Sequence, residues 1–178
     1  MKTILVPIDG SDVSEKALEL ALDLAQHHKA RVTLLHVLLR DKEPEELLRL
    51  PDLPASGPDI AAELARLVKA PSAWRSAEEL MADPNLPNHP MAEPLLRKVG
   101  LHVLRRGCAR AAKRGVAAEA LDLADGAAAP TIVATAEAIG ADTIVIGSRG
   151  LRQIEAITFG SVSDEVRRTA RCTCIAVH

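Results

Sequence analysis

One stretch near the C-terminal end constrains the fold more than any other part of the chain. The apolar run Ile144–Ile146 leads into Gly147-Ser148-Arg149-Gly150, and after nine further residues Gly160-Ser161-Val162-Ser163 opens a helical pattern. A buried strand, a glycine-rich turn and a second Gly-Ser step at a helix start can bring two sets of backbone N–H groups toward one anion. Glycine lets the backbone approach a ligand closely, and the two serines add hydroxyl donors where the helix dipole favours negative charge. The pattern predicts a phosphate site.

Elsewhere the chain alternates short β-rich runs with helical patterns, which is typical of βα units and a mostly parallel sheet. Strands are predicted near residues 3–8, 31–37, 116–122, 142–147 and 172–177. Helices are predicted between the first two strands, over about 94–114, over about 130–139, and from Gly160-Ser161 to near Ala170. Asp12, with Glu15 three residues on, is the predicted cap of the first helix. We therefore expect an α/β fold with a doubly wound, mostly parallel five-stranded sheet and helices on both faces.

The length and the proline distribution indicate how the chain is divided. At 178 residues, 48% of them hydrophobic, it is long enough for one well-buried core and short for two. A single domain over residues 1–178 is expected, with a Pro-rich surface insertion at about 40–93, because nine of the eleven prolines lie between Pro44 and Pro94. Asp59 is predicted to cap a short amphipathic helix there. The insertion either packs back on its own domain, or serves as a lid or as a docking element for a protein partner.

Composition excludes several classes of function. The formal net charge is −2, and Trp74 and Phe159 are the only aromatic residues of the Trp, Tyr and Phe types, so a basic groove with stacking platforms for nucleic acid is not expected. The apolar run Ile4–Ile8 is far too short to span a membrane. Three cysteines, and no signal-peptide pattern at the N-terminus, indicate a reducing cytoplasm. Neither a P-loop nor a G-x-G-x-x-G motif is present.

Three separated segments resemble the universal stress protein family. The spacing Gly147-x2-Gly150-x9-Gly160-Ser161 looks like the ATP-binding signature of that family. The opening Ile4–Ser11 is similar to its first strand, and Leu34–Val37 is similar to its second. The resemblance covers roughly residues 1–39 and 95–178. It implies a Rossmann-like fold of the adenine nucleotide alpha hydrolase type and a regulatory protein that binds ATP, with Mg²⁺ or Mn²⁺ as the accompanying ion.

The resemblance also implies which residues contact the nucleotide. Pro7 and Asp9 would border it, with Asp9 near the ribose or the nucleotide-bound divalent ion, and Val37 would meet the adenine through its backbone. The ribose and phosphates would be lined by Ile146, Gly147, Arg149 and Gly150. The phosphate chain would be held by Gly160, Ser161, Val162 and Ser163. No catalytic residue is expected in this set.

Several of these residues have a plainer interpretation. Asp9, followed by Gly10-Ser11, also suits a turn and helix cap that needs no ligand, and Arg149 also suits a solvated surface. His36, inside an apolar run, is expected to be a core histidine. Cys172 and Cys174 lie two apart on a predicted strand, which favours a buried or interface strand over a metal site.

We expect a cytoplasmic regulator whose surface or partners respond to ATP. The predicted site offers phosphate donors but no second carboxylate, lysine or activated nucleophile, so catalysis is not expected to be its main role. One alternative is an enzyme that slowly hydrolyses ATP or phosphorylates itself at Ser161 or Ser163. The other is an interaction protein that acts through the insertion without a nucleotide. The C-terminal strand Cys172–Val177 would be an unprotected edge in a monomer, and we expect it to pair in a homodimer.

Overall fold

The computed structural model describes residues 1–51, 53–69, 91–148 and 161–178. They form two compact units, one made of Met1–Leu38 and Gly100–His178 and the other of Leu39–Val99. The second unit corresponds closely to the segment predicted as an insertion. That the two belong to one domain stays a prediction.

The first unit is built on a five-stranded sheet in which every pair of neighbours is parallel. The strands are β1 (Thr3–Pro7), β2 (Arg31–Leu35), β3 (Ala118–Ala120), β4 (Thr143–Gly147) and β5 (Thr173–Val177), and their order across the sheet is β3-β2-β1-β4-β5. This confirms the predicted doubly wound α/β fold. All five strands lie within two residues of their predicted bounds at each end, and the third is shorter than predicted by two residues at both ends.

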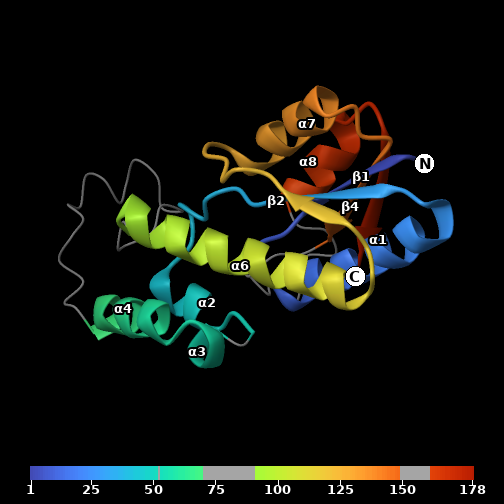
Figure 1. Cartoon of the computed structure of the whole chain (residues 1–178). Coiled ribbons are helices and arrows are strands. Elements are labelled where there is room, and N and C mark those ends of the chain that lie inside the picture. The colour runs from blue at the N-terminus through green and yellow to red at the C-terminus, as the bar shows by residue number, and fades with distance from the viewer. Residues whose placement is uncertain (52, 70–90, 149–160) are drawn as a thin grey trace. The chain divides into compact units, whose positions relative to one another are not determined.

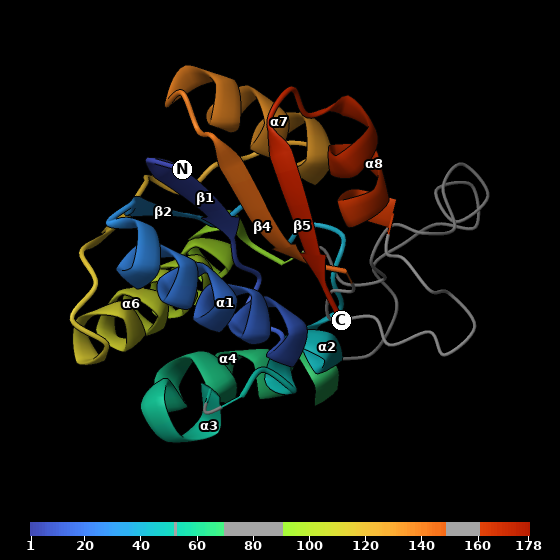
Figure 2. The ribbon, with the colours of Figure 1, turned by 90° about the vertical axis from the view of Figure 1, so that its right-hand side faces the viewer.

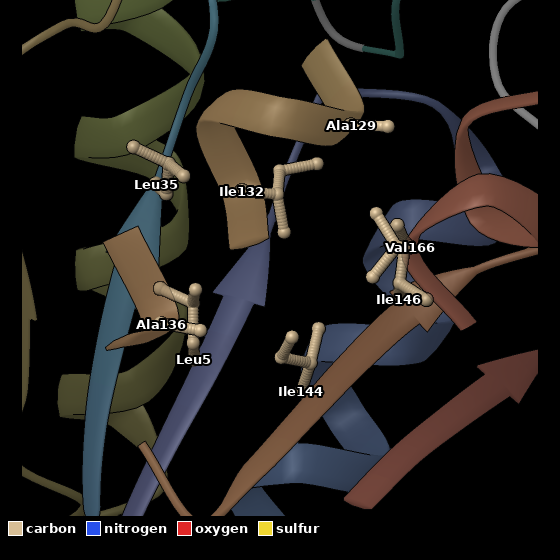
Figure 3. Packing of buried hydrophobic residues seen from close by; sticks show 8 residues of the cluster. All are labelled: Leu5, Leu35, Ala129, Ile132, Ala136, Ile144, Ile146 and Val166. Carbon is tan, nitrogen blue, oxygen red and sulfur yellow. The ribbon is translucent and has the colours of Figure 1, made fainter. Parts of the chain in front are cut away.

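Helices cover both faces of this sheet. Figure 1 and Figure 2 show α1 (Asp12–His28) and α6 (Glu93–Lys113) on one side, and α7 (Ala128–Ala138) and α8 (Ser161–Thr169) on the other. A parallel sheet buried in this way needs apolar side chains on both faces of its central strands, and every residue of β1 is buried. Under α7 and α8 the strands and helices share one core cluster (Figure 3), made of Leu5, Leu35, Ala129, Ile132, Ala136, Ile144, Ile146 and Val166.

The cap of α1 differs from the sequence prediction. Ser11, and not Asp12, is the N-cap, since its side chain accepts a hydrogen bond from the Ser14 N–H at 3.2 Å. Ser11 Oγ in turn donates to Asp9 Oδ1 at 2.6 Å, which fixes the hydroxyl in the capping position. Asp12 and Glu15 lie in the first turn, where their negative charges interact favourably with the helix dipole. The predicted cap was therefore wrong by one residue.

A ladder of charges joins α1 to α6 within the first unit. Arg106 and Arg110 contact Glu15, at 3.3 and 2.6 Å, and Arg110 also contacts Glu19 at 3.1 Å. Arg114 continues the ladder at the next turn by pairing with Glu19 and Asp23. Since successive rungs are four residues apart on both helices, the two helices run parallel with a fixed register.

The described part of the second unit is helical, with α2 (Pro44–Leu48), α3 (Leu53–Ser56), α4 (Pro58–Lys69) and the first residues of α6. Prolines begin α2 and α4, where the missing N–H costs nothing, so part of the high proline density marks helix starts. Leu47, Leu53 and Leu64 are fully buried within this part of the chain. Asp59 lies in the first turn of α4, after its start at Pro58, so its prediction as the cap was also wrong.

The close approach of α6 to β2 gives the first prediction. A Cβ atom on Gly100 would lie 2.6 Å from His36 Cδ2 and 2.7 Å from Leu123 Cδ2, nearer than carbon atoms can pack. Gly100→Val is expected to lower the free energy of unfolding by about 1–3 kcal/mol through overpacking, measured by urea denaturation. Ala109→Val, at an exposed position of the same helix, is the control and should change it by less than about 0.5 kcal/mol. Equal stability of the two variants would contradict the packing described.

Candidate functional site

The sheet reverses its winding direction between β1 and β4. From β1 the chain builds outward through β2 and β3, and it then returns to the other side of β1 for β4 and β5. Ile4 pairs with Thr143 and Leu5 with Ile144, so the same register continued beyond the strand ends places Asp9 level with Ser148. In open α/β sheets, ligands bind outside the carboxyl ends of the strands at such a reversal. Asp9 and Ser148, which are more than a hundred residues apart in the sequence, thus follow the ends of two neighbouring strands.

Asp9 follows β1 and is half-buried. Its Oδ1 atom accepts hydrogen bonds from the Ser11 N–H at 3.0 Å and from Ser11 Oγ at 2.6 Å. Gly10 has a φ of +85°, a conformation that suits glycine and turns the chain into α1. One carboxylate oxygen therefore holds the turn and cap. Within the described part of the chain Oδ2 has no hydrogen-bond partner, and it is the atom that can accept from a ligand hydroxyl or contact a cation.

Val37, two residues beyond β2, has its backbone groups turned toward the end of β1. It forms an isolated parallel bridge with Ala124, in which the Leu38 N–H donates to the Ala124 carbonyl at 2.9 Å and the Ala124 N–H donates to the His36 carbonyl at 3.1 Å. These bonds use the groups of the residues that flank Val37. Its own N–H and C=O point to the opposite side, where β1 has already ended at Pro7. Val37 thus offers a donor and an acceptor beside the turn that carries Asp9.

His36 links the ends of β1 and β2. Its Nδ1 lies 2.9 Å from the Ile8 carbonyl oxygen, which can only accept, so Nδ1 carries the proton and donates. The side chain is 1% exposed, and Nε2 has no hydrogen-bond partner among the described residues. Burial lowers the pKa of His36, while the bond to Ile8 and the charge of Asp9 raise it to a lesser extent. The structure is consistent with the expected core histidine, and it shows that this side chain also fixes the peptide that precedes Asp9.

Ser148, the residue after β4, has hydrogen bonds at three polar groups. Its N–H donates to the Val177 carbonyl at 2.6 Å, and its Oγ lies 2.9 Å from His178 Nδ1. Its carbonyl accepts from Ser163 Oγ at 3.0 Å. Sequence reasoning did not single out Ser148 or His178. Each follows the last residue of a strand, at Gly147 and Val177, so the signal becomes readable only once these two strands are known to pair.

The other residues of the predicted site are distributed as follows. Pro7 is buried at the end of β1, Ile146 belongs to the core cluster, and Gly147 is half-buried at the end of β4. Helix α8 begins at Ser161, and Val162 packs against the core cluster from its first turn. Arg149, Gly150 and Gly160 lie outside the described residues.

Ser163 differs most from its expected use. Its hydroxyl was expected to donate to a phosphate, but it is buried and donates to the Ser148 carbonyl. The first N–H groups of an α-helix have no partner within the helix, so the backbone of the first turn of α8 can still serve an anion. With the Ser163 hydroxyl bonded to Ser148, the main-chain N–H groups are the part of this turn that we expect a ligand to meet.

Outside 52, 70–90 and 149–160, no group of three or more His, Cys, Asp or Glu side chains is placed to hold a metal ion. Cys172 and Cys174 are half-buried beside the core cluster, and burial raises the pKa of both thiols. Of the helices that the structure describes, none is long and apolar enough to cross a membrane.

Comparison with known proteins gives a consistent family. The sequence profile of the Universal stress protein family matches residues 1–178. Universal stress protein YxiE of Bacillus subtilis (strain 168) is 30% identical over 174 residues, which covers 98% of this chain and 97% of the relative.

Two similar solved structures have a nucleotide bound. The universal stress protein from Archaeoglobus fulgidus in complex with dAMP has a TM-score of 0.57 at 20% identity and is covered to 98%, with 100% of this chain matched. A universal stress protein family protein from Arabidopsis thaliana with AMP bound has a TM-score of 0.57 at 18% identity and is covered to 91%, with 99% of this chain matched. At these identities the likeness shows a shared fold.

His36 gives the second prediction, a loss of stability in mild acid. The pKa of His36 is lowered in the folded state, whereas in the unfolded chain it is about 6.5. Below a pH of about 6.5 the unfolded chain therefore binds more protons than the folded protein does. The free energy of unfolding should thus fall as the pH drops below about 6.5, by up to about 1.4 kcal/mol per pH unit from this group. Urea denaturation between pH 7.5 and 5 measures the slope.

The matched variants for this test are His36→Asn and His27→Asn. Asparagine at 36 keeps an N–H near the Nδ1 position but does not titrate, so it should flatten the slope. His27 lies on the exposed side of α1, and His27→Asn is the control for replacing a histidine outside the buried position. The same slope in the His36→Asn variant would show that the buried imidazole is not the titrating group.

Proposed function

We propose that this chain, which belongs to the universal stress protein family, binds an adenine nucleotide at the carboxyl ends of β1, β2 and β4, with ATP and Mg²⁺ or Mn²⁺ as the ligand. The observation that carries the proposal is the pairing of β1 with β4, which brings the Asp9 turn beside the end of β4 and the start of α8. The dAMP and AMP bound to two proteins of the same fold support an adenine nucleotide as the class of ligand.

Each part of the nucleotide has a chemical counterpart in this arrangement. The backbone N–H and C=O of Val37 suit the polar edge of an adenine ring, and Asp9 Oδ2 suits a ribose hydroxyl or the divalent ion. The phosphates fit the Gly147 turn and the first N–H groups of α8. Arg149, Gly150 and Gly160 complete the motif in this proposal, with Ile146 along the ribose and phosphates and Val162 among the residues that hold the phosphate chain.

The proposed role is regulation in the cytoplasm, with partners that respond to the bound nucleotide. Among the described motif residues Asp9 is the only carboxylate, and its Oδ1 atom already accepts two hydrogen bonds from Ser11. This leaves one carboxylate oxygen for a ligand and favours a binding role over a catalytic one. Slow ATP hydrolysis or autophosphorylation is the enzymatic alternative, and the bond from Ser163 Oγ to Ser148 makes Ser163 a poor acceptor for the phosphoryl group. A protein partner that binds the second unit without a nucleotide is the alternative from the interaction class.

The third prediction tests nucleotide binding itself. ATP with Mg²⁺ at about 100 times its Kd should raise the free energy of unfolding by roughly 2.7 kcal/mol, visible as a higher Tm. Gly160→Val should abolish this rise, because a β-branched side chain would crowd the phosphates at the helix start. Ala134→Val, on the exposed side of α7, is the control and should keep it. A full rise in the Gly160→Val variant would move the site elsewhere.

The fourth prediction is that ATP is bound far better than it is turned over. A phosphoryl-transfer enzyme must orient the attacking oxygen and stabilise charge on the transferred group, and the motif residues supply little for the first task. Turnover should be very slow, on the order of single events per many minutes, against about 1–100 per second for kinases. Phosphate release by the unmodified protein and by Asp9→Asn measures it. Rapid release that Asp9→Asn eliminates would make this an ATPase.

The fifth prediction concerns a homodimer through β5, the last strand of the described sheet. The Thr173 N–H and the Val177 carbonyl bond toward β4, so the backbone groups of Thr173, Ile175 and Val177 face β4 and those of Cys174 and Ala176 face the open edge. Pairing with a second copy would use the latter. Ala176→Pro removes one edge N–H without touching the β4 ladder, and it should convert a dimer to a monomer in light scattering.

Ala176→Val keeps that N–H and is the matched control, which should remain dimeric at micromolar concentration. A monomer mass for the unmodified protein would reject the dimer. A dimer that persists in Ala176→Pro would place the interface on another surface.

A further inference from the structure

We propose that His178 is a positioning residue that acts through Ser148 to hold the first turn of α8 against the end of β4. In this way it sets the affinity for the phosphate chain of the nucleotide and not for its base. The inference rests on the nucleotide site proposed above.

The register of β4 and β5 explains why these two side chains meet. Gly147 pairs with Val177, so Ser148 and His178, the next residues of the two chains, lie opposite each other in the same register. Side chains two apart on a strand share a face. Ile144 and Ile146 of β4 belong to the core cluster under α7 and α8, and Cys174 of β5 packs against it. Ser148 and His178 therefore continue the same two stripes, at the point where the sheet ends.

At this point the stripe on β4 changes from apolar to polar while staying buried. Ser148 is 0% exposed, and a buried hydroxyl costs free energy unless it is hydrogen-bonded. Its Oγ is hydrogen-bonded to His178 Nδ1 at 2.9 Å. Its backbone N–H donates to the Val177 carbonyl, and its carbonyl accepts from Ser163 Oγ. An alanine would fill this position without any polar demand. The partners of the hydroxyl thus define what the serine contributes.

The hydrogen bonds connect β5 to α8 in sequence. His178 fixes the side chain of Ser148, the Ser148 carbonyl accepts from Ser163 Oγ, and Ser163 lies in the first turn of α8. The N–H groups of that turn are therefore held relative to the carboxyl end of β4. Hydrogen-bond donors that are fixed in advance bind an anion without being ordered by it, so loosening them weakens the contact.

Val37 and Asp9 depend on other bonds. Val37 is held by its bridge to Ala124, and Asp9 is held by Ser11 and by the link from His36 to Ile8. A loss at Ser148 should reach the phosphates and leave the base and ribose contacts in place. The ratio of ATP to adenosine affinity separates this role from a general structural one.

The test measures the Kd of ATP by calorimetry, and that of adenosine by competition against ATP, for the unmodified protein, His178→Leu, Ser148→Ala and the double variant. Each single variant should weaken ATP about three- to tenfold, the range of one net hydrogen bond, and change adenosine by less than about twofold. Because the two residues act as one link, the double variant should be no weaker than either single variant.

Two controls complete the set. His178→Asn places an amide nitrogen or oxygen near the Nδ1 position and should restore most of the ATP affinity. Thr143→Val removes a buried hydroxyl at the opposite end of β4 and should leave the ratio of ATP to adenosine affinity unchanged. If His178→Leu fails to fold, Ser148→Ala, which removes a single oxygen atom, carries the test.

The outcomes are distinct. Equal weakening of ATP and adenosine in a folded variant would show a general structural role, and unchanged ATP affinity would show that the link positions nothing; either result overturns the proposal. Absence of any ATP or adenosine binding by the unmodified protein would instead overturn the nucleotide site and, with it, the phosphate role of His178.

Discussion

The pairing of β1 with β4 is the contact on which the rest of the first unit depends. β1 lies in the middle of the sheet, with Leu5 and Ile144 fully buried at its junction with β4. Because all strands are parallel, each crossover lays a helix on a face of the sheet, and the change of direction at β1 distributes these helices over both faces. It also brings the carboxyl ends of two distant strands to one place. The packing of the core thus determines where on the sheet a ligand site can form.

Apolar runs with clear borders made this fold predictable from sequence. The strands that flank the reversal are short, hydrophobic and bounded by polar or glycine residues, and their bounds were predicted within two residues. The third strand was predicted too long because only Ala118–Ala120 pairs with β2, at an exposed edge where burial does not extend it. The cap of α1 was misplaced since the sequence does not show that Asp9 orients the Ser11 hydroxyl.

The candidate site was less predictable, because its bonds depend on registers between elements. The sequence marks Ser163 as polar at a helix start, but only the position of α8 against β4 directs its hydroxyl to the Ser148 carbonyl. The hydrogen bond between His178 and Ser148 can be recognised only once β5 is known to pair with β4. The ion pair between Glu15 on α1 and Arg106 on α6 was unpredictable for the same reason. In the sequence, each of these charged residues is equally typical of a solvent-exposed helix surface. Local patterns predict elements, and contacts between elements require the assembled fold.

The proposed site divides its polar groups between two tasks. Side-chain groups such as the Ser163 hydroxyl, the His36 imidazole and one oxygen of Asp9 hold the protein together. In the proposal, the ligand meets mostly main chain among the described residues, at Val37, at Gly147 and in the first turn of α8. A main-chain donor survives substitution of its own side chain as long as the backbone stays in place. Substitution of the side chains that face the proposed ligand would then leave its main-chain contacts in place, and the proposed phosphate contacts depend on the buried side-chain bonds that fix the backbone.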